Sequence, residues 1–245
     1  MSFQKSNDNK IFPVLLCGGS GTRLWPVSRE SLPKQFLRIK HLINNSFIQE
    51  TQNRVQEIKN IQGPILICNK EHRFIAAQQM KDINISNVEI ILEPFGRNTA
   101  PAIAITSIKA LELDADPILL FLPTDHIIKD IKKFVATISE GIEYAKKDNI
   151  VTFGIMPDRP ESGFGYIEAL NALNFEKNKA ESIKRFIEKP NKSDAEKFIL
   201  DRKFSWNSGI FLMKAKVALN ELKKYSPNIY EKCYAAYHKS FYDLD

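Results

Sequence analysis

The chain has 245 residues, of which 43% are hydrophobic and 26% charged, a composition typical of a globular protein rather than a disordered or fibrous one. Lys and Arg together number 35 against 29 Asp and Glu, which gives a net charge of +6. The basic residues form no long runs, and this argues against a nucleic-acid-binding arm or a membrane-surface patch. No segment has the ~18 consecutive apolar residues of a membrane span, and residues 1–10 are too polar for a signal peptide. We therefore expect a cytoplasmic protein with no membrane or nucleic-acid partner.

The three cysteines and four histidines are scattered along the chain. None has the spacing of a zinc site, and the cysteines indicate no disulfide framework. Any metal ion is therefore expected to have oxygen ligands.

Apolar runs alternate with helical patterns over the first half of the sequence. An unbroken apolar run at residues 11–17 ends at two glycines and predicts a strand buried on both faces of a sheet. Ser46 and Gln49 have the spacing of a capping box, which predicts a helix that extends to about residue 59. Further strands are predicted at residues 64–69, 88–93 and 118–122, with helices at residues 71–81 and 99–113. Thr99 is expected to cap the last of these helices.

The pattern changes after residue 150. Strands are predicted at residues 150–155, 165–170, 182–188 and 209–213, and helices at residues 193–202, 217–225 and 228–242. These indicate a smaller mixed or antiparallel sheet region joined to the first. We expect an α/β fold, with a Rossmann-like, mainly parallel sheet flanked by helices, in one domain whose halves are residues 1–150 and 151–245.

A glycine loop follows the first predicted strand. Gly18, Gly19 and Gly21 permit positive φ and let backbone N–H groups converge on an anion, for which a phosphate is the expected ligand. The loop matches neither a Walker A loop, which needs glycine in place of Arg23, nor a dinucleotide fingerprint, which needs Gly or Ala in place of Leu24. The alternative is a simple turn with solvated cations nearby.

Six ordered motifs share a resemblance. They are GGSGTRLWPVSRESLPKQF at residues 18–36, EPFGRNTAPA at 93–102, PTDH at 123–126, GFGYI at 163–167, FIEKP at 186–190 and WNSGIF at 206–211. Together they resemble the signature of the sugar-1-phosphate nucleotidylyltransferases, and the Trp-Pro and Pro-Lys-Gln-Phe variants point to the mannose-1-phosphate guanylyltransferases among them. The resemblance implies the nucleotide-diphospho-sugar transferase fold, with a nucleotide-binding first half and a sugar-binding second half.

The implied reaction transfers GMP from GTP to mannose 1-phosphate and releases pyrophosphate. Catalysis of this kind depends on positioning and charge neutralisation, for which Arg23 and Lys34 supply cations and Lys189 a further phosphate partner. Nucleotide-binding residues implied by the resemblance are Gly18, Gly19, Ser20, Gly21, Thr22, Arg97 and Asn98. The last two offer donors and acceptors suited to the edges of guanine.

A metal site and a sugar site are also expected. Asp125 follows a predicted strand and can hold Mg²⁺ through its carboxylate, although the same residue type also caps turns. The resemblance makes Glu188 an acceptor for sugar hydroxyls, lets the sugar approach the backbone at Gly165, and gives Asn207 hydrogen bonds to mannose. Each of these three also fits an ordinary turn or surface position.

The sequence departs from the family in two respects. Phe164 stands where relatives often have Tyr. Relatives usually continue with a motif bearing a second aspartate and with a further domain, so we expect the second half to be incomplete at its C-terminus.

Trp25 and Trp206 are expected to pack in the interior rather than stack on a ligand.

Three functions remain open at this point. The first is a guanylyltransferase, the second a thymidylyl- or uridylyltransferase that acts on a glucose phosphate, and the third a non-catalytic subunit that binds a nucleotide sugar and regulates a partner. The oligomeric state is also open, a homo-oligomer included.

Overall fold

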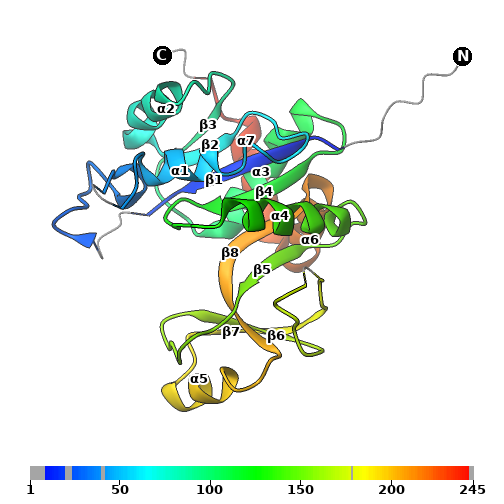
Figure 1. Ribbon diagram of the computed structural model, residues 1–245. Helices are drawn as coiled ribbons and strands as arrows, with labels where there is room; N and C mark the ends of the chain where they lie inside the picture. The colour runs from blue at the N-terminus through cyan, green and yellow to red at the C-terminus, as the bar shows by residue number, and fades with distance from the viewer. Residues whose placement is uncertain (1–8, 20–23, 40–41, 178, 243–245) are drawn as a thin grey trace, which may run out of the picture.

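The computed structural model describes residues 9–19, 24–39, 42–177 and 179–242. Within them, eight strands form one sheet in the order β3-β2-β1-β4-β8-β6-β7, and β5 also pairs with β8 (Figure 1). The strands are β1 (Ile11–Cys17), β2 (Ile65–Asn69), β3 (Glu89–Glu93), β4 (Ile118–Pro123), β5 (Val151–Ile155), β6 (Gly165–Ala169), β7 (Ile183–Glu188) and β8 (Phe204–Lys214).

Helices cover both faces of the parallel part of the sheet. One face packs against α1 (Phe47–Asn53), α2 (Arg73–Asp82) and α4 (Ile131–Ala145). The other packs against α3 (Thr99–Leu113) and α6 (Ala215–Tyr225), and α7 (Pro227–His238) lies against both of these helices. A short 3-10 helix, η2 (Lys34–Phe36), precedes α1, and a second, η3 (Lys70–His72), precedes α2.

Alternating side chains of the parallel strands divide between two cores. Leu15 and Leu66 belong to the cluster with α1, α2 and α4, whereas Val14 and Ile65 belong to the cluster with α3 and α6. All four are fully buried. This is the burial that an unbroken apolar run predicts for a strand between two helical layers.

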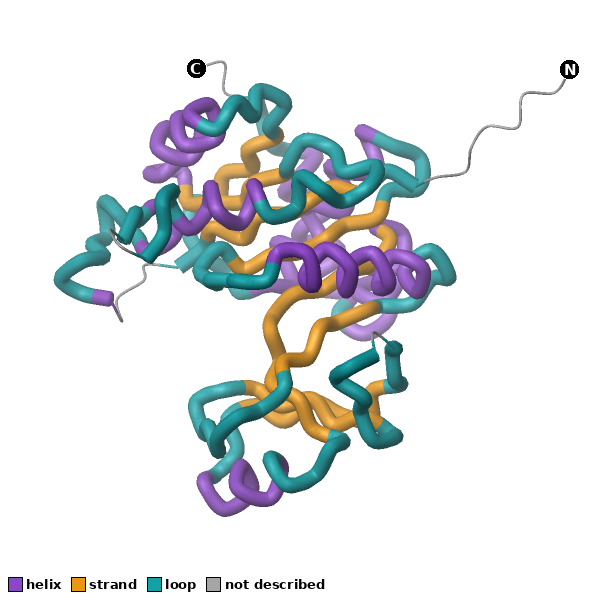
Figure 2. The backbone as a smooth tube through the Cα atoms, viewed as in Figure 1, coloured by secondary structure: helices purple, strands orange, loops and turns teal. Residues whose placement is uncertain are grey.

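The long strand β8 joins the two parts of the molecule (Figure 2). Its second half pairs antiparallel with β4, and its first half pairs with β6, where Trp206 lies opposite Tyr166. We call β1–β4 with their helices the body, and β6, β7 and α5 (Lys192–Phe198) the lobe. The lobe has its own small core of Tyr166, Ala195, Phe204 and Trp206.

The fold class predicted from the sequence is confirmed, with corrections at particular elements. The helix predicted to extend to residue 59 ends at Asn53, because Val55 and Ile58 turn into the core through hydrogen bonds of the tighter i→i−3 type. Thr99 is not a cap but the first helical residue, since Asn98 occupies the N-cap position. Helix α4 was not predicted, although Asp130 caps it by accepting a hydrogen bond from the Lys133 amide at 2.9 Å.

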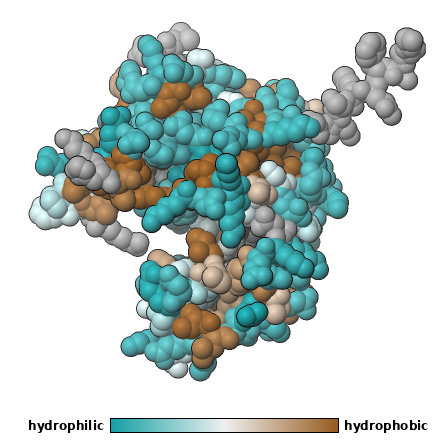
Figure 3. Space-filling view, viewed as in Figure 1, coloured by the Kyte–Doolittle hydropathy of each residue, from teal (hydrophilic) through white to brown (hydrophobic). Residues whose placement is uncertain are grey.

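The face of the molecule in Figure 3 is mainly hydrophilic, with hydrophobic side chains in separate patches. In the part of the chain that the structure describes, no helix has both the length and the apolar character needed to cross a membrane.

Candidate functional site

The candidate site begins where β1 and β4 end side by side. The two strands are parallel, with Leu16 opposite Pro123, so the loops that follow them leave the same edge of the sheet. Ligands of open α/β sheets bind at this edge. The glycine loop starts there with Gly18 and with Gly19, whose φ of +103° suits a residue without a side chain. Residues 20–23, with the predicted nucleotide-binding residues Ser20, Gly21 and Thr22 and the predicted catalytic residue Arg23, lie outside the described residues.

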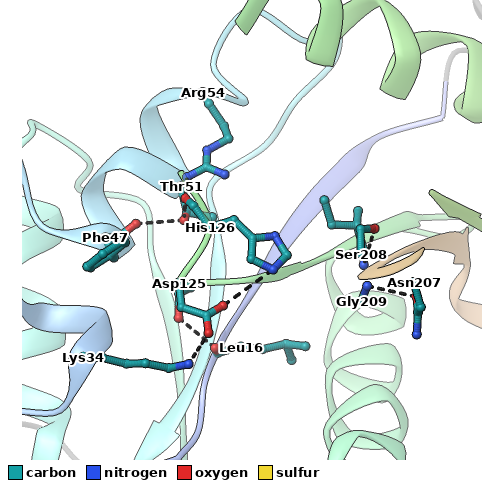
Figure 4. Close-up of polar contacts among 12 residues, drawn as sticks. Leu16, Lys34, Phe47, Thr51, Arg54, Asp125, His126, Asn207, Ser208 and Gly209 are labelled. Carbon is teal, nitrogen blue, oxygen red and sulfur yellow. Dashed lines mark hydrogen bonds and ion pairs between the residues drawn. The ribbon is translucent and has the colours of Figure 1, made fainter. Parts of the chain in front are cut away.

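Lys34 and Asp125 meet at this edge although 91 positions separate them in the sequence (Figure 4). The Lys34 ammonium, on η2, donates a hydrogen bond to Oδ2 of Asp125, which lies just beyond β4. Each side chain is 32% exposed. The structure thus brings the predicted catalytic lysine and the predicted metal ligand into one ion pair that solvent can reach.

Two further side chains tie these loops to β1 and to Gly19 through hydrogen bonds, and the sequence indicated neither. The Gln35 side-chain amide donates to the Cys17 carbonyl at 2.6 Å and to the Gly19 carbonyl at 3.4 Å. The Thr124 hydroxyl donates to the Leu16 carbonyl at 2.8 Å. Gln35 belongs to the Pro-Lys-Gln-Phe motif, which was the available signal. Because both side chains are buried, these bonds fix the backbone that carries Lys34 and Asp125.

A cavity of about 560 Å³ opens beside the ion pair. Its lining comes from the body and from β8, and consists of Leu16, Gly18, Lys34, Gln35, Thr99, Ala100, Ile103, Pro123, Thr124, Asp125, Asn207, Gly209 and Phe211. The first turn of α3 is among these residues, so the positive end of a fifteen-residue helix faces the cavity. With Lys34, this end provides an environment suited to anions.

The predicted nucleotide-binding residues Arg97 and Asn98 lie in the exposed loop before α3. The Arg97 guanidinium lies 4.6 Å from the centroid of the Phe95 ring, a cation–π contact. Asn98 has a φ of +64° and a ψ of −168°, a backbone conformation that is common only for glycine. Neither residue lines the cavity itself.

The three predicted sugar-binding residues come together from three strands. Gly165 on β6 lies opposite Glu188 on β7, and a Cβ placed at Gly165 would lie 2.9 Å from the Glu188 carboxylate and 3.6 Å from Cβ of Asn207. Asn207, on β8, also lines the cavity, and its Oδ1 accepts a hydrogen bond from the Gly209 amide at 3.0 Å. Because it has no side chain, Gly165 leaves open the space between the Glu188 carboxylate and the Asn207 side-chain amide.

Lys189 follows β7 directly and adopts a φ of +45°, which is uncommon for a residue with a side chain. Its ammonium lies 3.3 Å from the Glu188 carboxylate, and its amide donates to the Phe164 carbonyl at 3.2 Å. Strained backbone of this kind is concentrated at functional sites. The turn keeps the predicted phosphate partner beside the predicted sugar acceptor.

The two tryptophans behave differently. Trp206 is 7% exposed and packs edge-on against Phe164, with ring centroids 5.2 Å apart. Trp25 is 77% exposed, so the prediction that it packs in the interior is wrong: it lies in a turn in which residues 24–27 are all exposed.

Burial shifts the pKa of two groups at the site. Desolvation lowers the pKa of His126, with further lowering from the positive charges of Arg54 and Lys34, while the Asp125 carboxylate opposes the shift. Burial raises the pKa of Glu93, which ends β3 close to Gly18. Neither shift was visible in the sequence, because both depend on which residues pack around the group.

Among the described residues, no three His, Cys, Asp or Glu side chains are grouped to hold a metal ion. Of the described residues that line the cavity, only Asp125 has a carboxylate. Magnesium at phosphate sites needs only one or two carboxylates, because phosphate and water oxygens complete its coordination. The donor set therefore fits a magnesium ion that arrives together with a phosphorylated ligand.

The fold and this edge define a class: an α/β protein with a cavity at the carboxyl ends of parallel strands, lined by a lysine, a carboxylate and the first turn of a helix. The model of the nucleotidyl transferase family matches residues 12–244, and the chain belongs to this family.

A curated relative from Klebsiella pneumoniae, named mannose-1-phosphate guanylyltransferase, is 45% identical over 226 residues, which cover 92% of this chain and 47% of the relative. A solved structure from Helicobacter pylori, described as a mannose-6-phosphate isomerase, is 34% identical with a TM-score of 0.75, covering 94% of this chain and 80% of that one. Another from Thermus thermophilus, described as a mannose-1-phosphate geranyltransferase, is 26% identical with a TM-score of 0.82, covering 95% and 65%. The chain spans about half the length of the curated relatives it matches.

Proposed function

We propose that this chain transfers GMP from GTP to mannose 1-phosphate, with GDP-mannose and pyrophosphate as products. The observation that carries the proposal is the Lys34–Asp125 pair, which shares one cavity with Asn207 of the sugar cluster. The names of the curated relatives support the reaction, and both solved structures are described as enzymes named for a phosphorylated mannose.

In the proposed reaction, an oxygen of the sugar phosphate attacks the α-phosphorus of GTP. The bond from that phosphorus to the bridging oxygen breaks, and pyrophosphate leaves with the electron pair. No covalent enzyme intermediate is required, so the chain contributes positioning and charge neutralisation.

Lys34 is the described cation best placed for this work. In the structure its ammonium pairs with Asp125, and a phosphate that enters the cavity would compete for its N–H groups. The amides at the start of α3 add positive potential on the same side. We propose that Arg23, from the glycine loop, supplies a second cation, as the family resemblance implies.

We propose Mg²⁺ as the cofactor, with Asp125 as its protein ligand. When bound, the ion would neutralise phosphate oxygens and make the α-phosphorus more electrophilic. Asp125 can serve both Lys34 and the ion because it has two carboxylate oxygens. Oδ2 accepts a hydrogen bond from Lys34, and Oδ1 lies 3.7 Å from Nε2 of His126.

The sugar is proposed to lie over Gly165. Glu188 and Asn207 flank that glycine and supply acceptors and donors for mannose hydroxyls, and Lys189 stands beside Glu188 for the sugar phosphate. Guanine is proposed to contact the loop of Arg97 and Asn98, which leads into the first turn of α3.

A pyrophosphate-release assay that crosses GTP, dTTP and UTP with mannose 1-phosphate and glucose 1-phosphate tests the proposal. We expect release to be fastest with GTP and mannose 1-phosphate and to require Mg²⁺. Faster release with dTTP or UTP and glucose 1-phosphate would instead support the second function left open by the sequence. Silence in every combination, with GDP-mannose still bound in a calorimetric titration, would support the non-catalytic subunit.

A further inference from the structure

A buried arginine lies behind the site and has no role in the proposed chemistry. Arg54 follows the last residue of α1 and is 5% exposed. Its guanidinium donates to the Glu50 carbonyl at 3.2 Å, to the Thr51 hydroxyl at 3.2 Å and to the His126 carbonyl at 2.7 Å. The last of these bonds joins residues 72 positions apart (Figure 4).

The charge of Arg54 has no direct ionic partner in the part of the chain that the structure describes. Within the described residues no carboxylate lies at ion-pair distance from it, and the nearby Glu50 carboxylate accepts hydrogen bonds from Asn45. Burial lowers the pKa of Arg54 to about 10, which leaves it protonated at neutral pH. Burial of a cation lowers the stability of the fold unless its hydrogen bonds compensate for the lost hydration. Packing alone would therefore favour an apolar side chain at this position.

The bond to His126 fixes the loop that carries Asp125. On one side of Asp125, the Thr124 hydroxyl is bonded to the Leu16 carbonyl of β1. On the other side, Arg54 holds the His126 carbonyl. Asp125 therefore lies between two anchored neighbours, and its carboxylate faces Lys34 (Figure 4).

We propose that Arg54 is a positioning residue, which acts through the His126 carbonyl to hold the Asp125 carboxylate at the cavity. It does not touch the ligand, because it is buried and absent from the cavity lining. A lysine has one ammonium in place of the forked guanidinium and can reach only part of this set of acceptors. The proposal rests on the proposed function for the role of Asp125.

Three variants separate positioning from general stability. R54M removes the charge and all three hydrogen bonds, and R54K keeps a charge. K214M is the matched control: Lys214 is a largely buried cation that pairs with Asp116 and Asp148 at the opposite end of β4 and β8.

The first measurement is hydrogen exchange of peptides that contain residues 124–127, which needs neither metal nor turnover. We expect R54M to exchange there at least ~10-fold faster, with β1 unchanged, and R54K to lie between R54M and the wild type. K214M should leave this peptide unchanged even if its melting temperature falls.

The second measurement is Mn²⁺ binding in the presence of GTP, followed by electron paramagnetic resonance. Residues that orient a metal ligand typically change affinity by about 10- to 100-fold, so we expect R54M to weaken Mn²⁺ binding by about 10-fold. In steady-state assays kcat should fall by a similar factor, whereas the KM for mannose 1-phosphate should stay within about two-fold.

Unchanged exchange at residues 124–127 and unchanged Mn²⁺ binding in folded R54M would overturn the proposal, whatever happens to its melting temperature. The wild-type protein separates this failure from that of the proposed function. If the wild type turns over and R54M behaves normally, only the positioning role is contradicted. If the wild type shows no turnover but R54M binds Mn²⁺ more weakly than the wild type, only the proposed reaction is contradicted. A wild-type chain that binds no Mn²⁺ with GTP would overturn both.

Discussion

The body and the lobe differ in how their strands are buried. Strands β1, β2 and β4 are buried almost throughout because helices cover both of their faces. In the lobe, β7 is exposed along nearly its whole length, and stability comes from a small aromatic core and from ion pairs across the strands.

The two parts accordingly provide different kinds of site. The body fixes Lys34 and Asp125 through buried hydrogen bonds to strand ends, which suits charges that must be oriented in advance. The lobe presents Gly165 and Glu188 on strands with one open face, which suits a hydrated sugar. We therefore expect substitutions in the body to affect stability and turnover, and substitutions in the lobe to affect substrate affinity.

The largest expected effect is on stability. Leu66 is fully buried in β2, so L66A should lower the free energy of unfolding by about 3 kcal/mol, through lost burial and the cavity left behind. Ile187 in the lobe is only half-buried, and I187A should cost about 1 kcal/mol. Urea denaturation measures both, and equal losses would contradict the comparison.

K34A should reduce kcat by at least ~100-fold, or about 2.7 kcal/mol of barrier, because it removes a cation that neutralises charge in the transition state. Pyrophosphate release under saturating GTP and mannose 1-phosphate gives the rate. K216A, at an exposed position of α6, is the control and should retain normal turnover. A K34A variant with more than a tenth of the wild-type rate would exclude Lys34 from the catalytic machinery.

G165V should raise the KM for mannose 1-phosphate by about 10-fold and leave the KM for GTP within about two-fold. The added side chain would meet the Glu188 carboxylate and fill the space beside Asn207. G163A, where a Cβ meets only the end of the Glu161 side chain, serves as control. If G165V raised both KM values equally, the lobe would not be specific to the sugar.

The smallest expected effect is pH-dependent and confined to the lobe. Hydrogen bonds from Lys184 and Arg185 lower the pKa of Glu168 below its ordinary value of 4.5. A carboxylate with a lowered folded-state pKa stabilises the protein above its ordinary pKa, and this contribution disappears as the pH falls through the lowered value. The melting temperature of E168Q should therefore lie below that of the wild type at pH 7, and the two should converge below pH 4.5. A constant difference from pH 7 to pH 3 would contradict the assignment.

Much of the fold followed from local sequence patterns. Apolar runs predicted β1, β2 and β4 to within a residue, because a strand between two helical layers needs an unbroken apolar stretch. The capping box at Ser46 predicted the start of α1 but not its end at Asn53, which packing of the following turn decides. Magnesium as cofactor and the division into halves at residue 150 stay predictions. Strand β8 belongs to the second half by sequence, but it pairs with β4 of the first half as well as with β6 of the second.

By itself, the sequence determined the layered α/β architecture and the chemical character of the site, since apolar periodicity, glycine content and charge are properties of short segments. Only the tertiary structure decided that Lys34 meets Asp125, that Gly165, Glu188 and Asn207 surround one space, and that Arg54 anchors His126. From the sequence alone, an arginine that follows a helix is predicted to be a solvated surface residue, and nothing in the adjacent residues indicates the burial of Arg54. These contacts depend on strand order and on the register in which distant segments pair, and only packing of the whole chain fixes both.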